Sequence, residues 1–514
     1  MSKTIIIIGA GLAGLSAALQ AAENGCNVKL VSSLPSERAQ SVMAEGGINA
    51  ALNTKDENDS PEEHFTDTIK AACGLADPNA VWGMTQAAPE LVHWLLKLGV
   101  KFNMSGYDDV DLRNFGGQKK KRTAFAQSDT GKQIMTAMID AVRRKEAFGM
   151  VERFSHHSFL TLRLCGNICC GCVIRDEYSQ EIVELPGNAV IVASGGMHGL
   201  FGNTTGSLSN TGEVTAELFR LGVPLVNGEM IQYHPTTVEC GGKRMLISEA
   251  ARGEGGRLFA LRNNQPWYFM EEKYPELGNL MPRDITAREI WKVSHESEVF
   301  LDMTEISKEV ISNKLSGLAD DCMTYLHKDI RKEPVPVLPG IHYFMGGILV
   351  DEQHRTSIQN LYAAGECCAQ YHGANRLGGN SLLGALYGGR VAAKSACEQA
   401  DGVVLSCVAQ IDIPPASQIS EIKQLNKVMQ ETMGVVRNEN TLLNGIQTVQ
   451  ALTGNLPLLG MAVLKSALAR KESRGAHWRE DYPKSNDDDY LKTTVARFDG
   501  KQIQISFVPV PERR

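Results

Sequence analysis

A chain of 514 residues, 43% hydrophobic and 22% charged, has an ordinary globular composition and is too long for one hydrophobic core, so we expect roughly two to four domains. Its 52 basic and 59 acidic residues give a formal net charge of −7, which argues against nucleic acid or an anionic membrane surface as a main partner. The first strand begins too early for a signal peptide, and no apolar run is long enough to span a bilayer, so we expect a cytoplasmic protein.

The chain opens with a buried strand that turns into a helix through a glycine-rich loop. Residues 4–14 read TIIIIGAGLAG, in which four isoleucines precede three glycines in the GxGxxG spacing. These glycines are Gly9, Gly11 and Gly14. They allow a tight turn and let backbone N–H groups approach a pyrophosphate at the positive end of the helix dipole. A helix over 12–24 and a second strand over 27–31 complete the order of a dinucleotide-binding unit.

The end of that second strand is where an acidic residue would bind the ribose of a dinucleotide, and this chain has Ser32 there, which can also hydrogen-bond a ribose. Further along, Gly46 and Gly47 indicate close approach of the backbone to a flat or charged group, with a simple turn as the alternative. Amphipathic helices are predicted through about Leu98. Residues 113–122 read RNFGGQKKKR and on their own predict a solvated basic loop.

Four of the twelve cysteines are close together in FLTLRLCGNICCGCVIRDE. They are Cys165, Cys169, Cys170 and Cys172. Their clustering suggests a metal or iron–sulfur site, but the alternating apolar residues around them favour a β-hairpin in which small thiols pack. No haem attachment motif exists, because the CxxC is followed by Val173. We therefore expect reduced, structural thiols and no metal site.

The middle of the chain continues the predicted sheet and then departs from it. Residues 185–196 form another buried strand whose carboxyl end lies near the ligand crevice. A helix over 210–221 has Glu213 in its first turn, near where a ribose could sit; the alternative is an ordinary acidic residue at a helix N-terminus. From about 227 to 347 the pattern changes to short strands and loops, which predicts an inserted domain.

The last third returns to glycine-rich sequence. A strand is predicted over 360–364, and Asn380 or Ser381 is predicted to cap a helix whose positive end can stabilise negative charge on a reduced cofactor ring. Helices follow over about 414–471, and a short β-like tail covers 502–508.

Over essentially its whole length, the chain resembles the flavoprotein subunits of the fumarate reductase and succinate dehydrogenase family, which also includes L-aspartate oxidase. The family motifs occur in order: the N-terminal glycine fingerprint, AEGGINAAL, RNFGGQKKKRTAFAQSDTG, QYHPT, EAARGEGG, PRD, HYFMGG, GECCAQYHGANRLGGNSL and SRGAHWREDYP. So many ordered motifs make an accidental similarity very unlikely.

The resemblance implies an α/β fold: a Rossmann-like FAD-binding domain with an inserted α+β capping domain, followed by a helical C-terminal domain. The implied boundaries are 1–230 for the first part of the FAD-binding domain, 231–347 for the capping domain that binds substrate, 348–405 for the second part, and 406–514 for the helical domain and tail.

The implied cofactor is FAD. We also expect Glu213 to contact it, because this residue lies in the first turn of the predicted helix over 210–221. The other implied FAD contacts are Gly9, Gly11, Gly14, Ser32, Gly46, Gly47, Glu366, Ser381 and Leu382. The resemblance also implies residues that hold the two carboxylates of a dicarboxylate: His234, Ser248, His342 and Arg376. Phe115 would wall this site, and Arg283 would donate a proton that Arg252 and Glu249 resupply.

The chemistry of the reaction agrees with these residue types. Reducing a double bond between two carboxylates needs a hydride donor on one face, an acid on the other, and cations that stabilise enolate-like charge. Arginine suits carboxylate binding but is an unusual acid, since its ordinary pKa is above about 12, so it needs a dry, cationic pocket. Because Arg376 falls in the FAD-binding domain and the other ligands in the inserted domain, we expect an interdomain cleft that closes on the substrate.

One departure from the family bears on the cofactor. Membrane-bound members attach FAD covalently to a histidine shortly before the AEGG motif, and Gln40 occupies that position here. An amide nitrogen is not nucleophilic, so we expect non-covalent FAD. The loss of the linkage is expected to lower the flavin potential, which favours fumarate reduction over succinate oxidation.

The leading hypothesis is therefore an FAD-dependent fumarate reductase or succinate dehydrogenase flavoprotein that works with a separate iron–sulfur subunit, without nucleic acid and without direct membrane insertion. Any membrane association would be through partner subunits. The enzymatic alternatives are an L-aspartate oxidase, which needs an acid to meet the amino group and for which Asp108, Asp109 and Asp111 remain candidates, or a reductase of another unsaturated acid. A flavin-binding electron-transfer or assembly protein is disfavoured, because it would not retain the cationic set.

Overall fold

The computed structural model describes residues 2–106, 109–207, 209–400, 411–415 and 418–514. Its first domain is built on a five-stranded parallel sheet with the strand order β20-β10-β1-β2-β6. The strands are β1 (Thr4–Ile8), β2 (Asn27–Ser32), β6 (Val151–Ser155), β10 (Ala189–Val192) and β20 (Leu361–Ala363). The four isoleucines of β1 are buried, as expected for a central strand covered on both faces.

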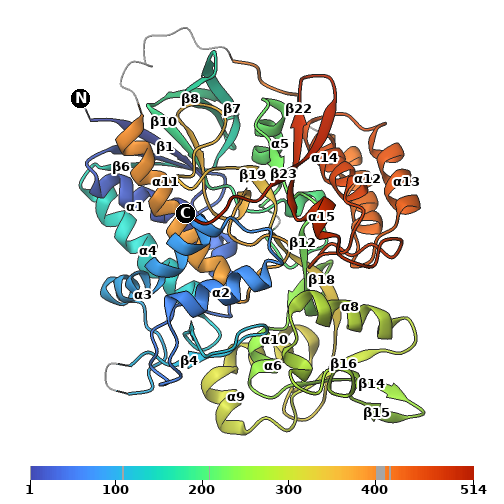
Figure 1. Cartoon of the computed structure of the whole chain (residues 1–514). Coiled ribbons are helices and arrows are strands. Elements are labelled where there is room, and N and C mark those ends of the chain that lie inside the picture. Colours follow the sequence, from blue (N-terminus) through green and yellow to red (C-terminus); the bar gives the residue numbers. More distant parts are fainter. Residues whose placement is uncertain (1, 107–108, 208, 401–410, 416–417) are drawn as a thin grey trace.

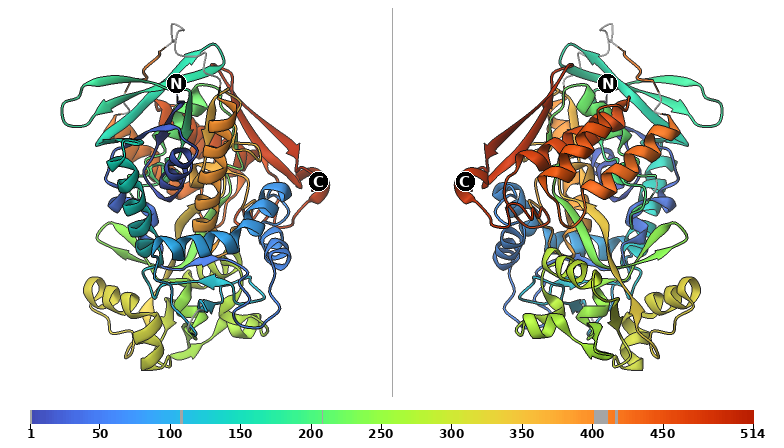
Figure 2. Two further views of the ribbon diagram at one scale, coloured as in Figure 1. Left: turned by 90° about the vertical axis from the view of Figure 1, so that its left-hand side faces the viewer. Right: turned by 90° about the vertical axis from the view of Figure 1, so that its right-hand side faces the viewer.

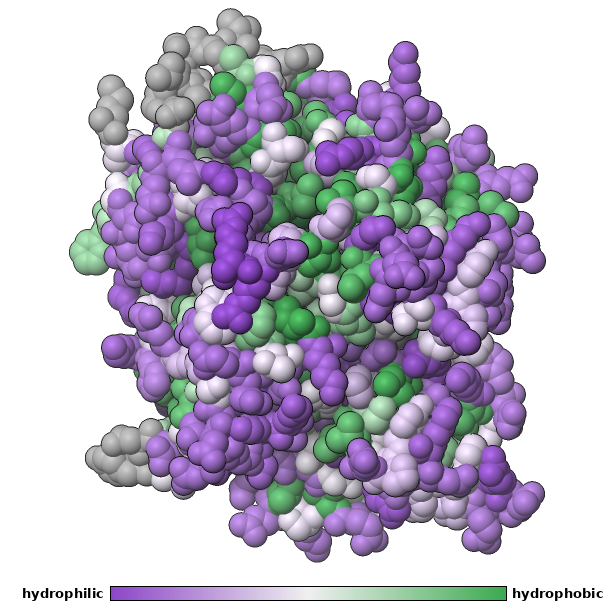
Figure 3. All heavy atoms as spheres, in the orientation of Figure 1, coloured by the Kyte–Doolittle hydropathy of each residue, from purple (hydrophilic) through white to green (hydrophobic). Residues whose placement is uncertain are grey.

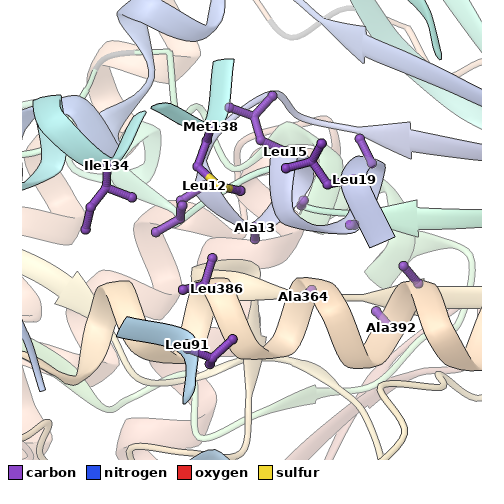
Figure 4. Packing of buried hydrophobic residues seen from close by; sticks show 14 of the residues in the cluster. Leu12, Ala13, Leu15, Leu19, Leu91, Ile134, Met138, Ala364, Leu386 and Ala392 are labelled. Carbon is purple, nitrogen blue, oxygen red and sulfur yellow. The ribbon is translucent and has the colours of Figure 1, made fainter. Parts of the chain in front are cut away.

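Two long helices pack closely beside this sheet. They are α1 (Leu12–Glu23) and α11 (Asn380–Gln399). Figure 4 shows α1 lying against α11, with Leu12, Ala13 and Leu386 between them. A Cβ on Gly389 would lie 2.3 Å from the Ala13 carbonyl oxygen, so only glycine allows this approach. The start of α1 therefore lies against the middle of α11.

The start of α11 corrects one prediction. Neither Asn380 nor Ser381 caps the helix; Gly379 is the N-cap, in a left-handed conformation with φ +84°, and no side chain accepts a capping hydrogen bond there. The Asn380 side chain is instead used in a buried polar network. The helix predicted over 210–221 also begins later than expected. It is α5 (Glu213–Arg220), which starts after Gly212.

The cysteine-rich segment forms the predicted hairpin and extends it to a three-stranded antiparallel sheet. Its strands are β7 (His157–Cys165), β8 (Ile168–Asp176) and β9 (Ile182–Pro186). Cys169, Cys170 and Cys172 are buried free thiols in β8. The expectation of reduced thiols is wrong for Cys165, which is disulfide-bonded.

A small antiparallel sheet and three helices complete this part of the FAD-binding region. They are β3 (Ile48–Asn49), β4 (Leu112–Arg113), β5 (Thr123–Ala124), α2 (Pro61–Ala71), α3 (Pro78–Leu98) and α4 (Thr130–Ala147). The basic segment 113–122 is only in part the solvated loop that its composition predicts. Arg122 is fully buried between Asp59 and Asp67, at 2.8 and 3.0 Å, because two carboxylates compensate its charge.

The inserted region has its own core, separate from that of the parallel sheet, and lies at the lower end of the molecule in Figures 1 and 2. It contains two antiparallel sheets, made of β12 (Ile231–Cys240), β13 (Lys243–Leu246) and β18 (Leu338–Phe344), and of β14 (Arg257–Arg262), β15 (Gln265–Trp267), β16 (Val299–Asp302) and β17 (Val335–Pro336). Its helices are α6 (Glu249–Gly253), α7 (Phe269–Lys273), α8 (Arg283–Ser294), α9 (Lys308–Lys314) and α10 (Ser316–Leu326).

The C-terminal part is helical, as predicted, and ends in a β-hairpin. Its elements are α12 (Ile419–Thr432), α13 (Glu439–Val449), α14 (Asn455–Ala469), α15 (Asp487–Tyr490), β22 (Lys492–Phe498) and β23 (Ile503–Pro509). The hairpin extends a sheet that also contains β11 (Leu225–Val226), β19 (Gly347–Leu349) and β21 (Cys368–Ala369). Residues 401–410, at the boundary implied between 405 and 406, lie outside the described residues.

The surface seen in Figure 3 is mostly hydrophilic, with hydrophobic residues showing between the polar ones near its middle. Among the described residues, no helix is both long enough and apolar enough to cross a membrane.

A buried arginine joins the C-terminal part to the rest of the molecule. Arg470 is fully buried and contacts Glu229 and Glu472 at 2.7 Å each, and it donates to the Lys492 carbonyl oxygen at 2.7 Å. Removing one partner of such a network leaves uncompensated buried charge.

We predict that Arg470→Ala lowers the free energy of unfolding by about 3–5 kcal/mol, because Glu229 and Glu472 then remain buried without their cation. Urea unfolding measures the change. Arg331→Ala removes an exposed arginine and should leave the free energy of unfolding close to that of the wild type. Equal small effects of both substitutions would contradict the prediction.

Candidate active site

One cavity of about 1460 Å³ runs between the FAD-binding region and the inserted region. Its lining extends from the glycine-rich loop after β1, along the start of α11, to side chains of β12, α6, α8 and β18. Most of the predicted site residues line it: Gly9, Gly11, Ser32, Gly46, Gly47, Phe115, Glu213, His234, Ser248, Glu249, Arg283, His342, Glu366, Arg376, Ser381 and Leu382. Gly14 and Arg252 lie behind this lining.

The glycine loop is shaped by two close backbone approaches. A Cβ on Gly9, whose φ is +112°, would lie 2.2 Å from the Ala193 carbonyl oxygen, and a Cβ on Gly14 would lie 1.8 Å from that of Gly9. Gly11, the N-cap of α1, lines the cavity and is open there. Gly9 and Gly14 thus set the turn, while Gly11 leaves the positive end of α1 open to an anion.

Two polar side chains lie at the far end of the cavity from the inserted region. The Ser32 hydroxyl is buried and has no hydrogen-bond partner among the described residues. Glu213, in the first turn of α5, also faces the cavity, and burial together with the nearby Glu217 raises its pKa. An unpartnered hydroxyl at the end of β2 fits the ribose of a dinucleotide, so the residues present suit FAD.

The central part of the cavity is lined by backbone and small residues. A Cβ on Gly46 would be 3.0 Å from the Phe115 ring, and Gly47 has φ +134°. Ser381 and Leu382 are in the first turn of α11, whose free N–H groups point out of the helix end. Glu366 accepts the Phe344 N–H at 3.1 Å. The two glycines therefore leave room where side chains would not fit, close to the Phe115 ring.

Two histidines of the inserted region face each other. The rings of His234 and His342 have centroids 5.1 Å apart and an interplanar angle of 65°. Burial holds the pKa of both imidazoles well below the ordinary range, and Arg283 lowers both further. Both are therefore neutral near pH 7, and each carries a single N–H; Nδ1 of His234 lies 3.0 Å from the Thr236 carbonyl oxygen.

A charged triad lies beside the histidines. Arg283 contacts Glu249 at 2.6 Å, and Arg252 lies 3.5 Å from the other oxygen of the same carboxylate. Although burial raises it, the pKa of Glu249 is held below its ordinary value by Arg283 and Arg252. Arg283 begins α8 just after Pro282, so the helix start fixes its direction. Arg252 does not line the cavity, and Glu249 lies between it and Arg283.

Arg376 comes from the other side of the cavity, in the FAD-binding region. It is buried, its guanidinium carbon lies 4.3 Å from the centroid of the Tyr343 ring, and no carboxylate is within ion-pair distance among the described residues. Burial and the nearby Arg283 lower its pKa to about 9, so it remains a cation near neutral pH. Its Nε is buried without a partner. Such a cation is available for an anionic ligand.

The smaller predicted residues complete the pocket. Ser248 is the N-cap of α6, where its hydroxyl accepts from the Ala250 N–H at 3.4 Å, and it faces the cavity. Phe115 is buried and forms part of the wall.

Gln40, which the sequence places at the position of the flavin-linked histidine, lines the cavity and accepts the Ser207 N–H. Two further cavity residues do not follow from the sequence reasoning: the Thr205 hydroxyl is 2.8 Å from Nδ1 of His342, and Glu45 has a buried carboxylate oxygen without a partner among the described residues. Glu45 adjoins the paired glycines, so the AEGG motif already indicated its place. Thr205 lies in a polar loop with no distinguishing signal.

Comparison with known proteins agrees with this site. The FAD binding domain family matches residues 4–382, and the family described as fumarate reductase flavoprotein C-term matches residues 452–513. Together with the cavity, these matches define an FAD-dependent oxidoreductase.

Individual relatives show which family of FAD-dependent oxidoreductases the chain belongs to. The chain is 37% identical to the succinate dehydrogenase flavoprotein subunit of Bacillus subtilis, over 100% of this chain and 98% of the relative. It is 33% identical to the 8-methylmenaquinol:fumarate reductase flavoprotein subunit of Wolinella succinogenes, over 100% and 92%. A structure of E. coli quinol fumarate reductase FrdA aligns with a TM-score of 0.89 at 27% identity, covering 99% of this chain and 97% of that one. The chain belongs to the family of succinate dehydrogenase and fumarate reductase flavoprotein subunits, which confirms both the resemblance and the fold class.

The carboxyl group of Glu45 gives a prediction for pH. Burial, with the nearby Asp321, raises its pKa from 4.5 to about 8. Between these values the folded protein holds a proton that the unfolded chain has released, so the free energy of unfolding falls as pH rises, by up to about 1.4 kcal/mol per pH unit. Glu45→Gln should remove this loss of stability. We expect the variant to be as stable as the wild type at pH 5 and more stable at pH 8, by at least about 1 kcal/mol.

Urea unfolding at both pH values measures this difference. Glu309→Gln, which replaces an exposed carboxylate on α9, should leave the pH dependence as in the wild type. A stability difference for Glu45→Gln that stays constant between pH 5 and pH 8 would show that Glu45 is ionised in the folded protein.

Proposed function

We propose that this chain interconverts fumarate and succinate, favours fumarate reduction, and uses Arg283 as the proton donor. The observation that carries the proposal is the charge of the pocket: Arg283 and Arg252 share the Glu249 carboxylate, and the buried Arg376 has no ion-pair partner among the described residues. An excess of buried positive charge is stabilised by a bound dianion. The two neutral histidines place uncharged imidazole rings beside it.

The cofactor would be held by the residues of the glycine loop, β2, the paired glycines and the start of α11. The N–H groups at Gly11 would meet the pyrophosphate, Ser32 and Glu213 the ribose, and Ser381 and Leu382 the ring. When bound, FAD supplies the hydride through N5 of its reduced ring. The partially buried position of these residues excludes water from the reacting face.

The substrate would be oriented by its two carboxylates. Arg376 would bind one of them through its planar fork, with His342 beside it. Ser248 and His234, on the inserted region, would bind the other. Because these ligands come from both regions, substrate binding draws the two together over the double bond.

The proton would come from Arg283. Its guanidinium is buried at the cavity wall, with the cations Arg252 and Arg376 nearby. After Arg283 gives a proton to the substrate carbon, a proton from solvent would be passed back to the guanidinium along Arg252 and Glu249, whose ionised carboxylate, 2.6 Å from Arg283 and 3.5 Å from Arg252, would take it up in transit.

The acidic residues proposed for an aspartate oxidase are poorly placed for an amino group. Asp111 pairs with Lys55 at 2.5 Å, and neither Asp109 nor Asp111 lines the cavity; Asp108 lies outside the described residues. This placement favours fumarate over L-aspartate. Another unsaturated dicarboxylic acid remains the alternative substrate.

The names of the relatives support a partner. The matched B. subtilis and W. succinogenes proteins are each described as a flavoprotein subunit. We propose that this chain likewise works with an iron–sulfur subunit, which passes electrons to FAD, and that contact with a membrane is through partner subunits.

We predict that Arg283→Gln reduces the rate of fumarate reduction by at least about 10²-fold while FAD remains bound, because the amide cannot supply a proton. Turnover with a chemically reduced viologen donor and the flavin spectrum measure the two quantities. Arg288→Gln changes an arginine of the same helix that stacks on Trp478 at 4.0 Å, outside the cavity, and should keep wild-type turnover. Wild-type turnover in Arg283→Gln would show that Arg283 is not the proton donor.

We further predict that FAD is bound non-covalently. The Gln40 amide has no nucleophilic nitrogen, and its oxygen accepts the Ser207 N–H, so the side chain contributes to loop structure. Acid precipitation should release all of the flavin into the supernatant and leave the protein band non-fluorescent on a denaturing gel. Flavin fluorescence in that band would refute the prediction.

A further inference from the structure

A buried polar network lies directly behind the turn that leads into α11. It joins four segments that are distant in sequence: β3, α2, the loop 115–123 and the turn at Gly378 and Gly379. The network is made of Asn49, His64, Gln118 and Asn380. All four are buried, while Gly379 and the residue after Asn380 line the cavity.

Asn49 uses every hydrogen-bonding position of its amide. Its Nδ2 donates to the Gly378 carbonyl oxygen and to Oδ1 of Asn380, at 2.7 Å each. Its Oδ1 accepts from Gln118 at 2.9 Å and from the Thr123 hydroxyl at 2.6 Å. A fully satisfied buried amide of this kind has one orientation, because a flip would oppose donor to donor.

The amide of Asn380 is held from the other side. The Thr68 hydroxyl donates to the His64 carbonyl oxygen at 2.8 Å, so its oxygen accepts from Nδ2 of Asn380 at 3.0 Å. This fixes Oδ1 of Asn380 toward His64 Nε2, 2.9 Å away. Burial, with the nearby Arg122, lowers the pKa of His64 to about 3, so a neutral imidazole donates this bond from Nε2–H.

The network fixes the direction of the turn. The Gly378 carbonyl accepts from both Asn49 and Gln118, at 2.7 and 3.0 Å, and so points into the network. In a trans peptide the following N–H, that of Gly379, points the opposite way. Gly379 lines the cavity, and a Cβ there would lie 2.1 Å from Oδ1 of Asn49, so the turn has no room to shift.

We propose that Asn49, His64 and Asn380 are positioning residues that aim the Gly379 N–H and the first turn of α11 at the flavin ring and so raise its two-electron potential. The inference rests on the proposed FAD site. Reduction adds negative charge to the ring, and a rigid helix N-terminus stabilises that charge more than the oxidised ring. Loosening the network weakens binding of reduced FAD more than that of oxidised FAD.

The test compares variants of two buried histidines that both contact α11. His64→Leu removes the donor to Asn380, at the first residue of the helix. His354→Leu removes a histidine that is equally buried and lies beside Gly388, about two turns further along, outside the cavity lining. His64→Gln retains a donor, and Thr68→Val removes the acceptor for Asn380 with little change of volume.

The readouts are the midpoint potential of the bound flavin and the dissociation constant of oxidised FAD, measured on the full chain. In His64→Leu, the ratio of the affinities for reduced and oxidised FAD should fall about tenfold, which corresponds to a midpoint potential about 30 mV lower. Thr68→Val should shift the potential in the same direction, while His354→Leu and His64→Gln should match the wild type.

Three results would overturn the inference: unchanged potentials in both His64→Leu and Thr68→Val, an equal shift in His354→Leu, or an upward shift. If His64→Leu does not fold, Thr68→Val decides alone. A wild-type protein that binds no FAD would instead remove the proposed function itself, and with it this inference, so the two failures are distinguishable.

Discussion

Buried positive charge at the junction of two regions is the constraint on which the rest of this structure depends. Arg252, Arg283 and Arg376 are all buried there, and one carboxylate, Glu249, contacts the first two. Burying charge is costly unless it is paired, and here burial lowers the pKa of Arg376 to about 9 without neutralising it. A dianionic ligand would complete the pairing, which connects the electrostatics of the fold with its chemistry.

The architecture explains how such a pocket is held. α1 and α11 pack side by side (Figure 4), with a close approach at Gly389. The N-terminal residues of both helices line the same cavity. The inserted region carries Arg283 and the two histidines on separate elements of its own core. Neither region contains the whole site, so the reacting groups meet only where the two regions touch.

Much of this could be predicted from the sequence, because glycine spacing and hydrophobic runs are local signals. β1, α1 and β2 follow directly from the fingerprint, and the alternating pattern around the cysteines predicts the β7–β8 hairpin. The fate of polar residues depends on contacts distant in sequence and could not be predicted. Arg122 is buried by two aspartates from another segment, and Asn380 joins His64 instead of capping its helix.

We propose that this cavity reduces a dicarboxylate with electrons from its flavin. To test this, the bound flavin is reduced chemically without oxygen and mixed with fumarate, and the absorbance of oxidised flavin is followed in a stopped-flow instrument. We expect that absorbance to return rapidly, with one fumarate consumed for each flavin. A flavin that stays reduced in excess fumarate would show that the cavity does not reduce this dicarboxylate.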